Sequence, residues 1–139
     1  MSVFSTPIRV YIEDTDAGGI VYYVNYLKYM ERARTEFMRA HGFDKRYIFN
    51  TDLLFVVHSL TVDYRASAVL DDELQVTADI LQCGRAALQF RQQVWRGAQL
   101  LCDAEVKIAC VDTHNRKPQR IPAPMLASLN ATCSGGTPL

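Results

Sequence analysis

Two aspartates and two glycines stand close together near the start of this sequence, in Asp14-Thr-Asp16-Ala-Gly-Gly. Gly18 and Gly19 would let the backbone approach a ligand closely. The first amides of the helix predicted after this turn would point outward with partial positive charge. Such amides stabilise an oxyanion that develops on a carbonyl, and a neighbouring carboxylate could attack that carbonyl or orient a water molecule. The turn is therefore a candidate for acyl chemistry.

The same two carboxylates have a simpler interpretation. Asp14 and Asp16 could serve only as turn formers and helix caps, which is their commoner role in an arbitrary protein. They could also hold Mg²⁺, but the sequence offers no evident third oxygen ligand or phosphate loop, so we expect no metal site. The three histidines suggest no site, because they have neither the spacing of zinc ligands nor a nucleophile motif beside them. They are His41, His58 and His114.

Charged residues elsewhere give weaker candidates. Glu31 could reach the site from the helix, although an ion pair with Arg34 explains it equally simply. Arg85, next to a turn, could contact an anionic ligand. A second basic stretch contains Arg116, Lys117 and Arg120. These side chains could also contact an anionic ligand, or they could be ordinary solvated charges.

A long amphipathic helix must position this turn. The apolar residues that recur at intervals of three and four are Tyr23, Tyr26, Leu27, Met30, Ala33, Phe37 and Ala40. Charged residues fill the other face, and Gly42 is typical of the residue that follows a helix. A helix of this kind is barely stable alone in water, so its apolar stripe must lie against the rest of the chain.

The rest of the chain alternates as strands do. The ranges predicted as strands are 6–12, 53–66, 74–81, 86–95 and 100–111. Because the last four are joined by short connections, we expect them to form an antiparallel meander. Phe43 to Asp52 reads as a polar and aromatic connection, and the periodicity fades from Pro118. One strand, a long helix and a run of strands predict an α+β fold with the helix on one face of the sheet.

Composition limits the possible functions. The chain has 139 residues, 49% hydrophobic, which suits one domain over residues 1–132 with a frayed tail over 133–139. Fifteen basic residues balance fifteen acidic ones, so no overall field favours nucleic acid. The four cysteines lack C-x-x-C spacing and no secretory signal is evident, so we expect reduced thiols and a cytoplasmic protein. No apolar run is long enough to cross a bilayer.

Three segments carry a resemblance to a known family: residues 9–23, Asn25-Tyr26, and residues 29–36. They resemble the hot-dog-fold acyl-CoA thioesterases of the YbgC type, which are associated with Tol-Pal gene clusters. They are similar, more loosely, to 4-hydroxybenzoyl-CoA thioesterase. Weaker similarity continues through Val62-Asp-Tyr, Leu70-Asp-Asp-Glu-Leu and Ala104-Glu-Val, so the resemblance covers roughly residues 8–112.

The resemblance implies a hot-dog fold, with a long helix wrapped by a five-stranded antiparallel sheet. It implies homodimers that pair into homotetramers, with active sites between subunits. The catalytic carboxylate falls on Asp16, and the amide that polarises the thioester carbonyl falls on Tyr23. Many YbgC-type members carry histidine at that position, so this chain keeps the amide and lacks the imidazole. The positions assigned to substrate and CoA binding are Gly19, Tyr26, Glu31 and Arg85, the last for the nucleotide phosphates.

The expected activity is hydrolysis of an acyl-CoA thioester to free acid and CoA, with Asp16 as nucleophile or general base. CoA is then part of the substrate, and no separate cofactor is expected. The acyl group could be short-chain, aromatic or fatty, and acyl carrier protein is a possible partner. An alternative is a non-catalytic binding or scaffold protein for acyl-CoA or acyl carrier protein, associated peripherally with the inner membrane.

Overall fold

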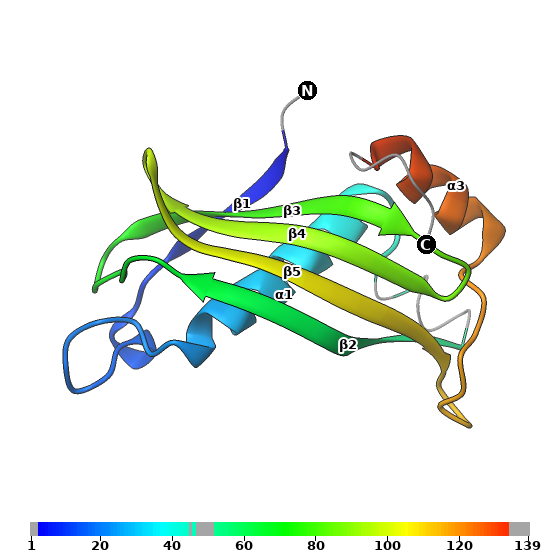
Figure 1. Ribbon diagram of the computed structural model, residues 1–139, viewed down its shortest axis with the longest axis horizontal. Coiled ribbons are helices and arrows are strands. Elements are labelled where there is room, and N and C mark those ends of the chain that lie inside the picture. Colours follow the sequence, from blue (N-terminus) through cyan, green and yellow to red (C-terminus); the bar gives the residue numbers. More distant parts are fainter. Residues whose placement is uncertain (1–2, 45, 47–51, 134–139) are drawn as a thin grey trace. The chain divides into compact units, whose positions relative to one another are not determined.

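The computed structural model describes residues 3–44, 46 and 52–133 (Figure 1). The elements in chain order are β1 (Phe4–Arg9), the short 3-10 helix η1 (Ile12–Asp14), α1 (Val24–Ala40), β2 (Leu53–Tyr64), β3 (Glu73–Cys83), β4 (Ala87–Arg96), β5 (Gln99–Asp112) and α3 (Ala123–Thr132). The predicted connection after Phe43 falls partly on residues 45 and 47–51, outside the described residues. The predicted tail, except Cys133, also lies outside them.

The five strands form one antiparallel sheet in the order β1-β3-β4-β5-β2, which confirms the α+β class and the five-stranded sheet. The expectation of a four-stranded meander is wrong, because β2 lies beside β5 rather than beside β3. After β2 the backbone remains paired with β5, where Arg65 and Ala66 both donate to the Leu101 carbonyl. The chain therefore reaches β3 through the longer segment 65–72 instead of a tight hairpin.

The first strand is shorter than predicted. It pairs with β3 from Phe4 opposite Ala78 to Arg9 opposite Glu73 and then ends, whereas the alternation continued to Ile12. The Asp14 carboxylate accepts a hydrogen bond from the Tyr11 N–H at 2.9 Å, and this contact closes η1. A local side-chain contact thus replaces further sheet pairing.

The chain divides into two compact units. The first comprises Met1–Phe37, Val62–Ala78 and Gln92–Ala104, and the second comprises Met38–Thr61, Asp79–Arg91 and Glu105–Leu139. Strands β2 to β5 contribute residues to both. The single domain over residues 1–132 stays a prediction.

In the first unit, α1 packs through most of its predicted stripe. Residues of α1 that are buried are Asn25, Tyr26, Tyr29, Met30, Ala33 and Phe37. The stripe was predicted to include Tyr23 and Ala40. Tyr23 precedes the helix and is 56% exposed, and Ala40 is also exposed, so the prediction is wrong for these two residues. The predicted stripe left out Asn25, whose amide is polar, and Tyr29, although Tyr29 lies three residues after Tyr26 and fits the same spacing. Gly42 follows the helix with φ +87°, as expected of a residue that ends it.

In the second unit, the sequence pattern missed helix α3. Its buried residues are Met125 and Leu129, one helical turn apart, after the buried Ile121. This four-residue spacing was the available signal, but Pro122 and small residues between the apolar ones obscured it. Cys133 follows the helix, and its thiol donates to the Leu81 carbonyl at 2.9 Å.

Three cysteines belong to the core, in agreement with the core-thiol prediction: Cys83, Cys102 and Cys110. Burial is the main reason that the pKa of each rises, to about 11, about 12 and about 11 respectively. Among the described residues, no helix is long and apolar enough to span a membrane. Nor does any group of three or more acidic, histidine or cysteine side chains within them suit a metal ion.

Candidate active site

The aspartate turn is folded back on itself by backbone hydrogen bonds. The Asp16 N–H donates to the Ile20 carbonyl at 2.9 Å, and the Gly19 N–H donates to the Asp16 carbonyl at 3.0 Å. Gly19 has φ +83°, a conformation that strains residues with a side chain. Beyond the turn, Thr15 pairs with Val21 as an isolated bridge. Asp16 therefore stands on a closed loop of defined shape.

The Asp16 carboxylate is exposed and, within the described part of the chain, held by a single contact. Its Oδ1 accepts a hydrogen bond from the Gly18 N–H at 2.8 Å. A Cβ added to Gly18 would lie 3.2 Å from this oxygen, so the glycine leaves the carboxylate its space. No partner for Oδ2 is found among the described residues. One oxygen orients the group and the other is available for chemistry.

Hydrogen-bond donors lie just before and at the beginning of α1, directly after this turn in the sequence. The Tyr22 N–H donates to the Asp14 carbonyl at 3.0 Å, and the Asn25 side chain donates to the same oxygen at 2.8 Å. The Tyr23 N–H, by contrast, has no acceptor within the part of the chain that the structure describes. A free N–H at the N-terminus of a 17-residue helix is a suitable donor to an oxyanion.

Asp14 is a structural residue by its contacts. Its carboxylate accepts the Tyr11 N–H, and its carbonyl fixes the start of α1. Asp16 also forms a local turn contact, so the interpretation of these residues as turn formers is correct for both. It does not exclude chemistry at Asp16, where one carboxylate oxygen remains available.

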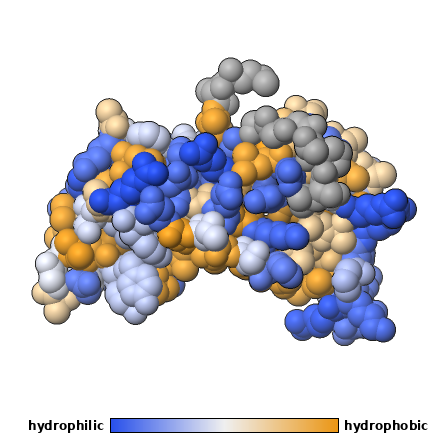
Figure 2. All heavy atoms as spheres, viewed as in Figure 1, coloured by the Kyte–Doolittle hydropathy of each residue, from blue (hydrophilic) through white to orange (hydrophobic). Residues whose placement is uncertain are grey.

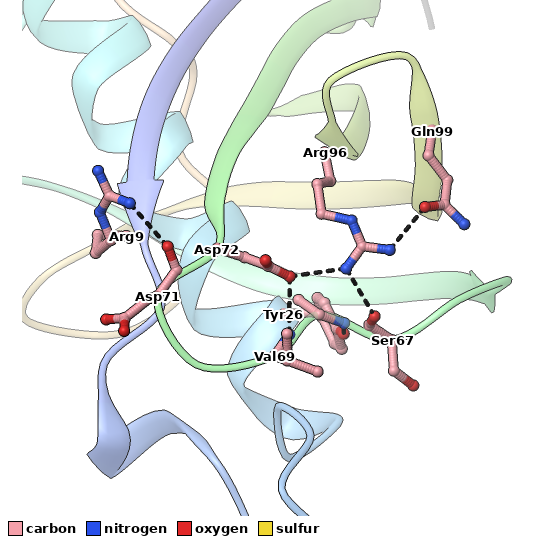
Figure 3. A network of polar contacts seen from close by, with 9 residues as sticks. Arg9, Tyr26, Ser67, Val69, Asp71, Asp72, Arg96 and Gln99 are labelled. Atoms are coloured by element: carbon pink, nitrogen blue, oxygen red, sulfur yellow. Dashed lines mark hydrogen bonds and ion pairs between the residues drawn. The ribbon is translucent and has the colours of Figure 1, made fainter.

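A second segment, residues 67–72, contacts the turn through its backbone, and Figure 3 shows this segment and the side chains around it. The Val21 N–H donates to the Ala68 carbonyl at 2.9 Å, and Ile20 pairs with Val69. The Tyr26 hydroxyl accepts the Ala68 N–H at 2.9 Å, and its side chain is 3% exposed. Burial is the main cause of the raised pKa of Tyr26. Tyr26 was predicted to bind substrate, and the structure gives its hydroxyl a partner in the protein.

Aromatic rings cover the start of the helix. The rings of Tyr22 and Tyr23 lie 5.0 Å apart, and Tyr23 meets Tyr64 edge-on at 5.9 Å. The Tyr64 hydroxyl donates to the Tyr23 carbonyl at 3.3 Å. All three rings are about half exposed. Sequence reasoning did not assign Tyr64 to the site, although it lies in the Val62-Asp-Tyr segment of the family resemblance.

The other predicted residues lie elsewhere. Glu31 is on α1, roughly 10 Å along the axis from its first residue at 1.5 Å per residue. Its carboxylate accepts the Thr35 hydroxyl at 3.0 Å. Arg85 is exposed between β3 and β4 in the second unit, where its carbonyl accepts the Ile121 N–H at 2.7 Å. Roles in substrate binding for both, and for Gly19 and Tyr26, stay predictions.

This chain is similar to known thioesterases. Residues 10–129 match the Thioesterase-like superfamily. The acyl-CoA thioesterase YbgC of Haemophilus influenzae is 42% identical over 128 residues, which cover 91% of this chain and 94% of that protein. The acyl-CoA thioester hydrolase YbgC of Escherichia coli O6:H1 is 41% identical over 127 residues, covering 91% and 95%.

Solved structures agree with the fold. A probable thioesterase from Bartonella henselae superposes with a TM-score of 0.83 at 31% identity, covering 87% of this chain and all of that one. The family match spans most of the sequence, including the aspartate turn and the start of α1. The chain therefore belongs to the Thioesterase-like superfamily, with a hot-dog fold and the sequence of a YbgC-type thioesterase.

Proposed function

We propose that this protein hydrolyses an acyl-CoA thioester to the free acid and CoA. Asp16 acts as nucleophile or general base, and the Tyr23 N–H binds the oxyanion. The observation that carries the proposal is that both groups belong to one short loop, seven residues apart in the sequence. Among the described residues, the Asp16 carboxylate is oriented through Oδ1 only and the Tyr23 N–H, directly before α1, has no acceptor.

Each group has a distinct part in the reaction. As the thioester carbonyl is attacked, its oxygen gains negative charge, which the Tyr23 N–H and the helix dipole stabilise. As general base, the free oxygen of Asp16 takes a proton from the attacking water and returns it to the CoA sulfur as the C–S bond breaks. As nucleophile, it attacks the carbonyl carbon and displaces the CoA thiolate, which leaves a mixed anhydride. A water molecule then hydrolyses the anhydride to the free acid and regenerates the Asp16 carboxylate, and a proton from this step neutralises the thiolate. CoA is part of the substrate, so no other cofactor is required.

The test is a thiol-release assay with short-chain, long-chain and aromatic acyl-CoAs, run on wild type and Asp16→Asn. Asparagine keeps an oxygen that can accept the Gly18 N–H but cannot act as nucleophile or base. We expect turnover to fall roughly 10²-fold or more, with folding and CoA binding nearly unchanged. Asp14→Asn is a matched control for loss of one nearby negative charge. Unchanged turnover in Asp16→Asn would dispose of this mechanism.

The proposal also covers the acyl group and the carrier to which it is esterified. YbgC relatives are named for acyl-CoA hydrolysis, which supports a CoA ester as the first substrate to assay. A short-chain, aromatic or fatty acyl group is compatible with the tyrosines around the helix start. Acyl carrier protein esters are a second possible carrier. Hydrolysis of the carrier ester without hydrolysis of any CoA ester would identify that preference.

We further propose that the protein works as a homodimer that pairs into a homotetramer, in the cytoplasm and alongside the Tol-Pal system. Strand β2 supports the assembly, because it is a long edge strand with exposed apolar side chains. Those side chains are Val56, Val57 and Leu60. Unpaired edges of this kind readily pair with a second copy.

A separate observation supports a second candidate function. The turn after β5 is exposed and basic, and Figure 2 shows strongly hydrophilic atoms at the lower right, where Figure 1 draws this turn. Its exposed cations are Arg116 and Lys117, with Arg120 beyond them. Such a turn suits a scaffold that lies on an anionic membrane surface. Co-sedimentation with anionic vesicles that is lost at high salt, and lost in Arg116→Ala/Lys117→Ala, would support this function.

A further inference from the structure

Side chains from other elements fix the segment that frames the aspartate turn (Figure 3). The Ser67 carbonyl accepts a hydrogen bond from Nη1 of Arg96 at 3.3 Å. The next residue, Ala68, donates its N–H to the Tyr26 hydroxyl at 2.9 Å. Two successive residues of the loop therefore have their backbone held by side chains of β4 and α1.

Arg96 is the centre of these contacts. Its Nη1 also donates to Oδ2 of Asp72 at 2.7 Å, and its Nη2 donates to Oε1 of Gln99 at 2.7 Å. Asp72 Oδ2 in turn accepts the Val69 N–H at 2.9 Å. The Arg96 side chain is one-third exposed and that of Asp72 is 19% exposed, so water screens this pair less than a surface pair. The planar fork of arginine serves three acceptors at once.

The segment fixed in this way is bonded directly to the loop of Asp16. Ala68 accepts the Val21 N–H, and Val69 pairs with Ile20. Ile20 accepts the N–H of Asp16 itself. Hydrogen bonds, joined by the backbone of residues 67–69 and 20–21, thus connect the Arg96 guanidinium to the backbone of Asp16.

We propose that Arg96 is a positioning residue for the thioesterase reaction, which holds residues 67–69 and so fixes the place of Asp16. The inference rests on the proposed function of Asp16. Arg96 itself contacts neither Asp16 nor the Tyr23 N–H. Its loss should therefore disturb the chemical step more than substrate binding, since small displacements of a reacting group are costly in rate.

The kinetic test compares three variants. Arg96→Met removes the fork but keeps an unbranched chain, and we expect kcat to fall roughly 10-fold to 100-fold with KM within about twofold. Arg96→Lys restores a cation and should recover part of kcat. The matched control is Arg65→Met. Arg65 pairs with its neighbour Asp63 at 2.9 Å and gives the loop no side-chain contact, so both constants should stay unchanged.

A second measurement does not depend on activity. Amide hydrogen exchange of Val21 and Asp16 reports whether the loop is still held, because both N–H groups donate to carbonyls in this chain of contacts. We expect faster exchange at both amides in Arg96→Met and unchanged exchange in Arg65→Met. Thermal unfolding of each variant shows that the assay temperature lies within the folded range.

The outcomes separate the two proposals. Unchanged exchange in Arg96→Met, or a raised KM with unchanged kcat, would overturn the positioning role even if Asp16→Asn is inactive. Faster exchange together with full activity in Asp16→Asn would keep Arg96 as the residue that fixes the loop and reject the role of Asp16 in catalysis. Loss of kcat with faster exchange in Arg96→Met, and inactivity of Asp16→Asn, supports both.

Discussion

At the scale of single residues, the site depends on what its atoms leave unpaired. Asp16 uses one carboxylate oxygen to accept the Gly18 N–H and keeps the other available. Tyr23 keeps a free N–H, while its carbonyl accepts the Tyr64 hydroxyl and the Tyr26 N–H. A backbone donor requires no particular side chain. In the proposed mechanism, the histidine that the family resemblance implies for many members can therefore be replaced by Tyr23 without loss of the oxyanion contact.

The backbone role proposed for Tyr23 predicts a contrast between two substitutions. Tyr23→Ala keeps the N–H, so thioesterase kcat should stay within about tenfold of wild type. Tyr23→Pro removes the N–H, and loss of one oxyanion donor typically lowers kcat by roughly 10²-fold to 10³-fold. Steady-state kinetics, with circular dichroism to confirm folding, would measure both. Equal kcat in the two variants would assign the oxyanion to another donor.

At the scale of elements, one buried amide ties α1 to the sheet within the first unit. Gln92 on β4 is 0% exposed, and its side-chain N–H groups donate to the carbonyls of Met30 at 2.9 Å and Thr77 at 3.1 Å. Its carbonyl oxygen accepts Nη1 of Arg34 at 2.8 Å. Burial is the main cause of the lowered pKa of Arg34. A satisfied network of this kind fixes the position of the helix on β3 and β4.

Removing that amide should be costly. Gln92→Ala leaves a cavity and three polar groups without their partner, and we expect the free energy of unfolding to fall by about 2–5 kcal/mol. Urea denaturation would measure it. Gln93→Ala is the control, because Gln93 is half-buried and its side chain makes one hydrogen bond to the described residues, accepting the Trp95 N–H at 3.2 Å. A change below about 0.5 kcal/mol in Gln92→Ala would contradict the role of the network.

Asp72 makes the stability of the segment depend on pH. Burial alone would raise the pKa of this carboxyl, but the Val69 N–H and the Arg96 guanidinium outweigh burial and lower it. Because the folded state binds the proton less readily than the unfolded state, Asp72 stabilises the fold fully at neutral pH. That contribution is lost as the pH falls through the lowered pKa.

The expected result is a loss of stability in acid that depends on Asp72. Urea midpoints measured from about pH 7 down to about pH 3 should fall for wild type. They should fall less steeply for Asp72→Asn, whose side chain does not titrate. Parallel curves for the two proteins would show that this carboxyl has no part in the acid sensitivity.

At the scale of the whole molecule, the edge of the sheet bears on how copies associate. Strand β2 ends the sheet, and most of its side chains are exposed on both faces. In a monomer such a strand would present unpaired backbone groups and apolar side chains to water. We therefore expect β2 to be covered by a second copy.

A charge on this strand tests the assembly. Val57 is 47% exposed, and Val57→Lys would place two ammonium groups near each other if two β2 strands pair. Analytical ultracentrifugation should then show a smaller species than wild type. Val3→Lys is the control, since Val3 is equally exposed but precedes β1. An unchanged sedimentation coefficient in Val57→Lys would exclude β2 as the contact.

The sequence alone determined the α+β class, the span of α1 and the place of Asp16, because all three depend on local signals. Apolar spacing marks a helix wherever it packs, and a short turn keeps Asp16 close to the start of that helix in any fold. The family resemblance further indicated thioester chemistry. Periodicity also located the five strands, with errors of a few residues at their ends.

Only the tertiary structure decided how the strands are ordered and which residues support the site. The placement of β2 beside β5 results from long-range pairing that alternation does not encode. The bond from Tyr26 to Ala68 spans 42 positions, and that from Arg96 to Ser67 spans 29. Contacts so distant in sequence leave no periodic pattern. The residues that hold the aspartate turn therefore became visible only when the chain was folded.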